Sequence, residues 1–135
     1  MSVPRTALLD TSVVLDLDRI PAEALPEEQA ISSITLAELA AGPHATDDEE
    51  ERARRQDRLQ RIEALLDPLP FDADAARAYG RVYAATRAAG RTPRGARAVD
   101  LMIAAVALSR SLPLVTRNPG DFAHLAGVGL CVHEI

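Results

Sequence analysis

Four acidic residues lie at points of the chain where a helix is predicted to begin or to have just begun. They are Asp10, Glu38, Asp100 and Asp121. In an open α/β sheet, residues at the carboxyl ends of parallel strands meet in one crevice, so we expect these four carboxylates to lie close together. Like charges in one crevice repel each other unless a hard divalent cation lies between them. The pattern therefore predicts a metal site and, with it, phosphate chemistry.

Each of these acids also has a purely structural interpretation. Asp10 can cap the helix that follows it, and Glu38 can close a capping box that begins at Thr35. Asp100 falls in the first turn of an apolar helix, where the helix dipole favours a negative charge. Asp121 ends a turn whose residue types need no function to explain them. The metal hypothesis therefore depends on all four acids occupying equivalent places, and not on any one of them.

The ligand types narrow the choice of metal. Carboxylates without a supporting cluster of His or Cys suit Mg²⁺ or Mn²⁺ and not zinc, and the three histidines lack ligand spacing. One or two such ions would lower the pKa of a bound water and stabilise the attacking and leaving oxygens of a displacement at phosphorus. The sequence thus favours metal-assisted hydrolysis.

Other magnesium-using α/β folds lack a required residue in this chain. There is no Gly-rich loop ending in Gly-Lys-Ser/Thr and no GxGxxG motif after the first predicted strand, which argues against nucleotide binding. A receiver domain normally uses a lysine, and the chain has none; a haloacid-dehalogenase-type phosphatase would have Asp-x-Asp where this chain has Asp10 and Ser12.

Charge is unevenly distributed along the chain. The net charge of −5 alone argues against a nucleic-acid partner. However, residues 75–99 contain six arginines and no acid. Two of them, Arg94 and Arg97, are candidate contacts for the phosphates that flank the reacting one. The absence of a signal-like or membrane-spanning segment predicts a cytoplasmic protein.

Apolar runs and turn residues predict a single α/β domain over residues 1–135. Strands are predicted at 5–9, 30–34, 112–115 and 128–132, and helices from 11 onward and at 35–41, 74–89 and 98–109. A long charged helix follows the capping-box pattern at 46–49, with an apolar stripe at Leu59, Ile62, Leu65 and Leu66, and ends at a break over 67–70. The single cysteine, Cys131, is expected to be a buried hydrophobe. Strands that alternate with helices imply a mostly parallel sheet covered on both faces.

Four sequence blocks together resemble a PIN-domain ribonuclease of the VapC toxin type. The blocks are LDTSVV at 9–14, ITLAELAAG at 34–42, DLMIAA at 100–105 and LVTRNPGDF at 114–122. The resemblance implies a three-layer α/β/α fold with a sheet of four to five strands. It also implies a Mg²⁺-dependent (or Mn²⁺-dependent) endoribonuclease that forms a homodimer and is neutralised by a VapB-type antitoxin.

The resemblance also assigns roles to individual residues. Asp10 and Asp100 match the firmest metal ligands of the family, and Glu38 matches the acid that orients a metal-bound water or a second ion. Ser12 matches the small polar residue that supports the first acid. In the fourth block, Thr116 and Asn118 are supporting or substrate-binding positions, and Asp121 is the fourth acid, since Asn118 occupies the place where many relatives carry one.

Two other functions remain open at this stage. The chain could be a non-catalytic module that keeps the PIN scaffold and binds RNA or a protein in its groove. It could also be a nuclease directed at DNA, although it is short for the clamp that branched DNA requires. Cleavage of RNA with and without EDTA distinguishes these alternatives.

Overall fold

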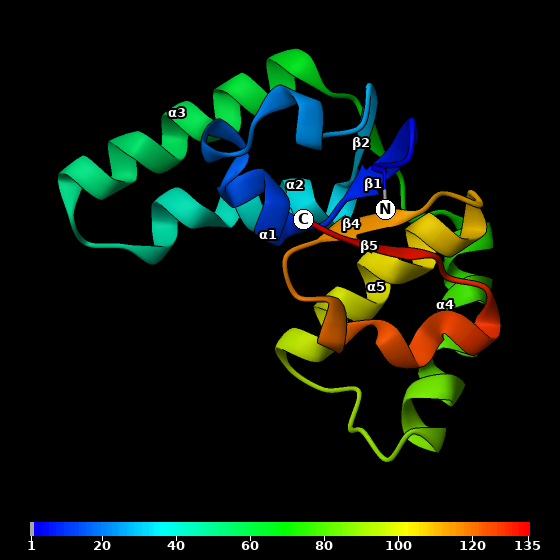
Figure 1. Cartoon of the computed structure of the whole chain (residues 1–135). Helices are drawn as coiled ribbons and strands as arrows, with labels where there is room; N and C mark the ends of the chain where they lie inside the picture. Colours follow the sequence, from blue (N-terminus) through cyan, green and yellow to red (C-terminus); the bar gives the residue numbers. More distant parts are fainter. Residues whose placement is uncertain (1) are drawn as a thin grey trace.

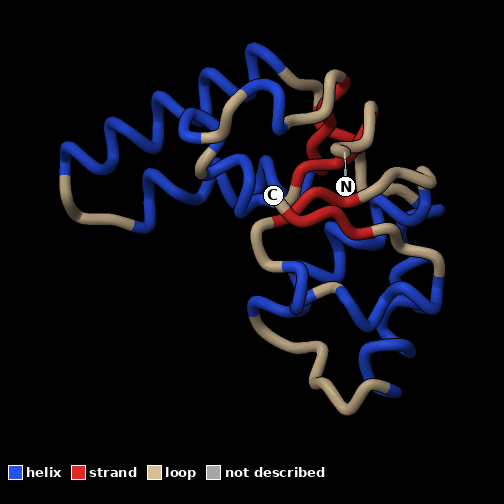
Figure 2. The backbone as a smooth tube through the Cα atoms, viewed as in Figure 1, coloured by secondary structure: helices blue, strands red, loops and turns tan. Residues whose placement is uncertain are grey.

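Five short parallel strands form the centre of the molecule. The computed structural model describes residues 2–135. The strands are β1 (Thr6–Leu9), β2 (Glu28–Ser32), β3 (Pro68–Leu69), β4 (Leu114–Thr116) and β5 (Val132–Glu134). They pair in the order β3-β2-β1-β4-β5, every neighbouring pair being parallel, and run between two groups of helices (Figure 2). The prediction of a mostly parallel sheet of four to five strands is confirmed.

Helices cover the sheet on both faces, so the fold has three layers, as predicted. One side carries α1 (Thr11–Leu15), α2 (Ser33–Ala41) and α3 (Glu49–Leu65), and the other carries α4 (Ala73–Ala88) and α5 (Ala96–Ser109) (Figure 1). Short 3₁₀ segments connect these elements at Leu17–Arg19, Ala22–Ala24, Gly42–Ala45, Pro119–Asp121 and Ala123–Val128.

Alternation along β1 divides the core between the two helical layers. Leu8 packs into the cluster that includes Leu101 and Ile103 of α5, whereas Ala7 and Leu9 pack into the cluster with Val13 of α1. Successive side chains of a strand point to opposite faces, and β1 is central, so its three buried positions are all apolar. Because α5 is also apolar on most of its circumference, it lies fully against this sheet, as the sequence predicts.

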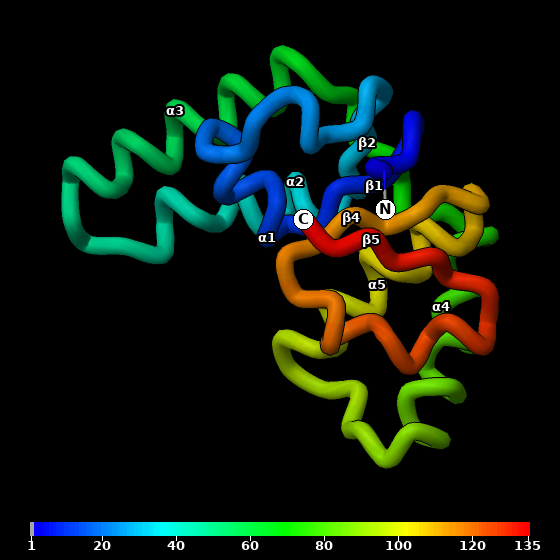
Figure 3. The backbone as a smooth tube through the Cα atoms, in the orientation of Figure 1, coloured from blue at the N-terminus to red at the C-terminus, as the bar shows by residue number. Residues whose placement is uncertain are grey.

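The charged helix α3 projects from the sheet as an arm with the preceding segment 42–48 at its tip (Figure 3). Its cap is Asp48, whose carboxylate accepts a hydrogen bond from the Glu51 N–H, and not Thr46 as the capping-box pattern predicts. Ile62 is buried as predicted, but Leu65 is 73% exposed and does not belong to the apolar stripe. The helix therefore packs along a narrower face than the sequence indicates.

Three local predictions near the sheet edges are wrong. The predicted break at 67–70 contains β3, a two-residue strand that pairs with β2 and is too short to leave a periodic signal. Residues 123–128 form a 3₁₀ segment, so the last strand is β5 and not 128–132. Cys131, just before β5, is exposed. Within residues 2–135, no helix has the length and apolar character that crossing a membrane requires.

Candidate active site

Asp10 lies directly after β1, at the carboxyl edge of the sheet. It occupies the position before α1, but its side chain makes no capping hydrogen bond. Instead, its Oδ2 accepts hydrogen bonds from the Ser12 hydroxyl and from the Thr116 hydroxyl, each at 2.8 Å. The structural role that the sequence allows, an N-cap, is therefore not the role that the carboxylate has.

The two hydroxyls that hold Asp10 are themselves fixed by the backbone that follows β4. The Arg117 N–H donates to the Ser12 Oγ at 3.2 Å, and the Asn118 N–H donates to the Thr116 Oγ1 at 3.0 Å. Each hydroxyl thus accepts a hydrogen bond from a backbone amide and donates one to the Asp10 carboxylate. The support expected from Ser12 and Thr116 is present in the geometry.

This arrangement leaves one oxygen of Asp10 without a partner. Asp10 is only 4% exposed, and its Oδ1 is buried with no hydrogen-bond donor. A buried charged oxygen that lacks a donor is energetically costly. A divalent cation would satisfy it, and carboxylate oxygens are the ligands that Mg²⁺ and Mn²⁺ prefer.

Glu38 reaches the site from the second turn of α2. The predicted capping box at Thr35 is wrong, because Ser32 caps this helix by accepting from the Thr35 N–H at 3.1 Å. The Glu38 carboxylate accepts a hydrogen bond of 2.6 Å from the Thr11 hydroxyl at the start of α1. A structural capping role therefore does not explain Glu38, which faces α1 across the edge of the sheet.

Asp100 lies in the second turn of α5, one turn deeper than predicted, because this helix begins at Ala96. Its pKa is raised to about 7, first by burial and then by the negative charges of Asp10, Asp121 and Glu38 in that order, while Arg97 opposes the rise. All three other acids act on this one carboxyl group. The four carboxylates are therefore near enough to one another for their charges to act together on Asp100.

The acids do not form a closed coordination shell in this structure. Within residues 2–135, no three His, Cys, Asp or Glu side chains are grouped closely enough to hold a metal ion as they stand. Mutual repulsion is expected to keep carboxylates apart when no cation neutralises them. The orphaned Asp10 oxygen and the electrostatic coupling around Asp100 are nevertheless features that a cation would relieve.

The fourth block places its polar residues at the rim of the site. Asp121 ends the 3₁₀ segment Pro119–Asp121 and is exposed, next to the fully buried Phe122. Asn118 is also exposed, and its backbone holds the Thr116 hydroxyl. Asp121 therefore acts on Asp100 through charge from a solvent-exposed position, and Asn118 contributes to the support of Asp10.

The predicted arginines lie on the α4–α5 side of this rim. Arg97 donates to the Thr92 carbonyl at 3.3 Å and is close enough to Asp100 to oppose the rise in its pKa. Arg94 is exposed in the loop before α5. The structure thus brings Arg97 to the acidic cluster and places Arg94 further out.

Sequence reasoning missed the hydroxyl network that joins α1 to α2. Thr11 Oγ1 lies 2.9 Å from the Oγ1 of the buried Thr35, in addition to its bond with Glu38. Thr11 directly follows Asp10, and Thr35 is three residues before Glu38, so the signal was proximity to two of the acids. The network fixes the spacing between the first and second acid.

Comparison with known proteins agrees with this geometry. The model of the PIN domain matches residues 7–128. The chain belongs to the PIN-domain family. This match includes all four acids and both supporting hydroxyls, and the parallel three-layer fold is the one that the sequence resemblance implied.

Two ribonucleases and one crystal structure are similar to this chain over most of its length. Ribonuclease VapC5 of Mycobacterium tuberculosis is 37% identical over 129 residues, which cover 93% of this chain and 92% of the relative. Ribonuclease VapC of Rickettsia bellii is 29% identical over 122 residues, covering 87% and 89%. The crystal structure of VapBC-5, a toxin-antitoxin system of M. tuberculosis, has a TM-score of 0.79 and 39% identity, with 98% of each chain covered.

Proposed function

We propose that this PIN-domain protein is a metal-dependent endoribonuclease and the toxin of a VapBC-type toxin–antitoxin pair. The observation that carries the proposal is the buried, unpartnered Oδ1 of Asp10, whose carboxylate acts by charge on Asp100, as do Glu38 and Asp121. A fold does not by itself keep such a charged oxygen without a donor. The relation to ribonucleases named VapC supports RNA as the substrate.

In this proposal Asp10, Asp100, Glu38 and Asp121 hold Mg²⁺, with Mn²⁺ as the alternative ion. A bound divalent cation supplies a water of lowered pKa and a positive charge for the leaving oxygen. Asp10 presents its free Oδ1 to the ion because Ser12 and Thr116 occupy its other oxygen. Thr11 orients the Glu38 carboxylate through their 2.6 Å hydrogen bond. Arg97 offers a positive charge to the RNA phosphates next to the one that is cut.

The proposed partners follow from the same relatives and from the shape of the site. A cavity of about 540 Å³ opens between α1, α2 and α3, and Thr11 and Glu38 are among the residues that line it. We assign to this cavity the C-terminal segment of a VapB-type antitoxin. An arginine of that segment would neutralise the acids by charge-assisted hydrogen bonds. The proposal includes a homodimer and action in the cytoplasm.

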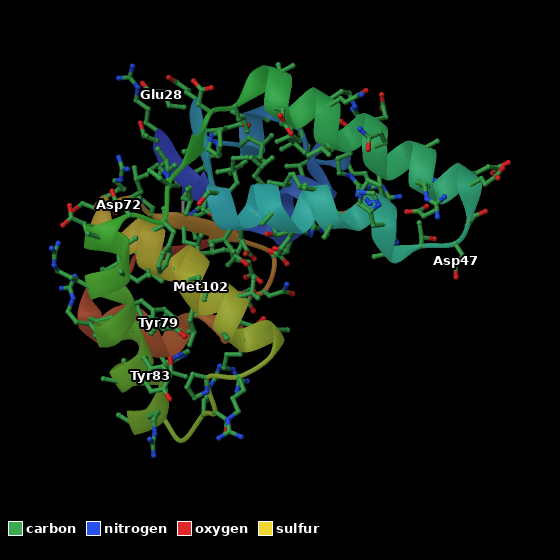
Figure 4. All side chains as sticks on the ribbon, turned by 180° about the vertical axis from the view of Figure 1, so that it is seen from behind. Glu28, Asp47, Asp72, Tyr79, Tyr83 and Met102 are labelled. Atoms are coloured by element: carbon green, nitrogen blue, oxygen red, sulfur yellow. The ribbon has the colours of Figure 1, made fainter. Side chains whose placement is uncertain are left out.

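Charge-removing, nearly isosteric substitutions test the metal assignment. Asp10→Asn and Asp100→Asn should each abolish Mg²⁺-dependent cleavage of a fluorescent RNA, because each removes a ligand charge and little volume. Circular dichroism checks that both variants remain folded. Asp47→Asn is the matched control, because Asp47 is exposed and lies at the far tip of the α3 arm (Figure 4). This variant should cleave RNA like the wild type.

The same assay separates an enzyme from a non-catalytic binding module. The wild type should cut RNA with Mg²⁺ and stop when EDTA is added, whereas a binding module retains RNA and yields no product in either condition. Full activity in Asp10→Asn or in Asp100→Asn would contradict the assignment of these residues as ligands.

A further inference from the structure

A second polar cavity lies on the α4–α5 side of the molecule, outside the acidic cluster. It has a volume of about 400 Å³ and opens between the end of α4 and the loop at 90–95. The polar and aromatic side chains that line it are those of Tyr83, Arg87, Arg91, Thr92 and Arg94. Gly90 and Gly95, with φ of +78° and +62°, allow the loop to turn sharply at both ends.

The arginines of this cavity are not neutralised by acids. No acid occurs between residues 75 and 99, and within residues 2–135 none of Arg87, Arg91 and Arg94 is within ion-pair distance of a carboxylate. In a chain with a net charge of −5, such a concentration of positive charge is a local exception. It favours an anionic ligand, and arginine is well suited to phosphate.

An aromatic ring completes the cavity. Tyr83 is 40% exposed, in a chain with only two tyrosines and two phenylalanines. Its ring centroid lies 6.1 Å from that of Tyr79, which in turn packs at 6.4 Å against Phe71. Figure 4 shows Tyr83 beyond Tyr79 along α4, toward the end of the helix. The ring is thus buttressed on one side and open to a planar ligand.

Two hydrogen bonds join this cavity to the acidic site. Arg91 donates to the Gly120 carbonyl at 3.0 Å, directly before Asp121. Arg97, whose charge acts on Asp100, donates to the Thr92 carbonyl in the cavity wall. These two arginines therefore connect the cavity wall to the residues around Asp100 and Asp121.

We propose that this cavity is a nucleotide subsite for single-stranded RNA, in which Tyr83 stacks on an unpaired base and Arg87, Arg91 and Arg94 hold the adjoining phosphates. The inference rests on the proposed function, because the subsite would hold the RNA that the acids cut. Arginines together with an exposed aromatic ring are the usual means of binding unpaired nucleotides. A duplex would not satisfy Tyr83, since its bases are already stacked.

Binding without cleavage tests the subsite directly. Fluorescence anisotropy in EDTA would compare an unstructured RNA of about 12 nucleotides with the duplex of the same sequence. Tyr83→Ser should raise the Kd for the single strand about fivefold and leave the duplex nearly unchanged, while Tyr83→Phe retains wild-type affinity because it keeps the ring. Arg87→Gln should reduce the slope of log K against log salt by about 0.7, the value for one phosphate contact on a single strand.

Arg81→Gln is the matched control, because Arg81 is an exposed arginine of α4 that does not line the cavity. If Tyr83→Ser and Arg87→Gln bind like Arg81→Gln while the wild type cleaves RNA, the subsite is wrong and the proposed function stands. If Tyr83→Ser and Arg87→Gln lose affinity for single-stranded RNA although the wild type cleaves no RNA, the subsite stands and the nuclease assignment is wrong. A change in oligomeric mass of Tyr83→Ser by light scattering, without a change in RNA affinity, would identify a subunit contact and overturn the inference.

Discussion

Asp100→Asn removes a negative charge that the fold holds at a cost, so it should stabilise the metal-free protein. Burial is the largest cause of the raised pKa of Asp100, followed by the charges of Asp10, Asp121 and Glu38. Asparagine has nearly the same shape and no charge. The substitution therefore relieves desolvation and repulsion and creates little empty volume.

The magnitude follows from the pKa of about 7 against the ordinary value of 3.8. At about 1.36 kcal/mol per unit, the full shift corresponds to roughly 4 kcal/mol. Asp100 is only half-buried, so solvent screening reduces the expected gain to about 1–2 kcal/mol. A raised pKa means that the folded state favours the protonated form of Asp100. The contribution of this carboxyl to the free energy of unfolding is fully present below pH 3.8 and is lost as the pH rises through about 7. The gain in Asp100→Asn is thus largest above neutral pH.

Thermal denaturation in EDTA measures this gain. For 135 residues, 1–2 kcal/mol corresponds to an increase in Tm of about 4–7 °C at about pH 8, and the difference should shrink at about pH 5. Added Mg²⁺ should raise the Tm of the wild type more than that of the variant, because it binds the folded state through this carboxylate. Asp74→Asn is a control, since its carboxylate is exposed and pairs with Arg77. An equal or lower Tm for Asp100→Asn in EDTA would show that the carboxylate stabilises the fold and would refute the reasoning.

Three further predictions concern a hydroxyl that holds Asp10, a histidine near the arginines, and the cap of α2. Thr116→Val removes the buried hydroxyl on Asp10 at constant shape, and steady-state cleavage should fall by about tenfold or more while Mg²⁺ affinity also falls. The pKa of His124 should be below 6.5 in an NMR titration, because burial and then the charges of Arg91 and Arg97 disfavour the charged imidazole. Arg91→Gln should raise this pKa, and an unchanged value would contradict the contribution of Arg91. Ser32→Ala removes the cap of α2 and should lower the free energy of unfolding by about 1 kcal/mol in urea, an effect whose absence would show that the cap contributes nothing.

Sequence patterns alone predict most of the strands and helices and place the four acids next to them. Short-range patterns suffice for this: an apolar run before Asp10 predicts a buried strand, and an apolar stretch after Asp100 predicts a buried helix. The same reasoning placed two helix caps wrongly: the cap of α2 is Ser32 and not Thr35, and the cap of α3 is Asp48 and not Thr46. Several residues near each helix start can cap it, and only the path of the chain selects one. It missed β3 because a strand of two residues has no period.

The surroundings of each carboxylate follow from the folded structure and not from the sequence pattern. The Thr116 hydroxyl that holds Asp10 is 106 residues away, and the Thr11 hydroxyl that holds Glu38 is 27 residues away. Whether Asp10 caps α1 or offers a free oxygen depends on these contacts, and so does the pKa of Asp100. Hydrogen-bond partners and burial are set by groups that become neighbours only when the sheet forms. Sequence spacing records which residue types are present, but it does not record the distances between their atoms.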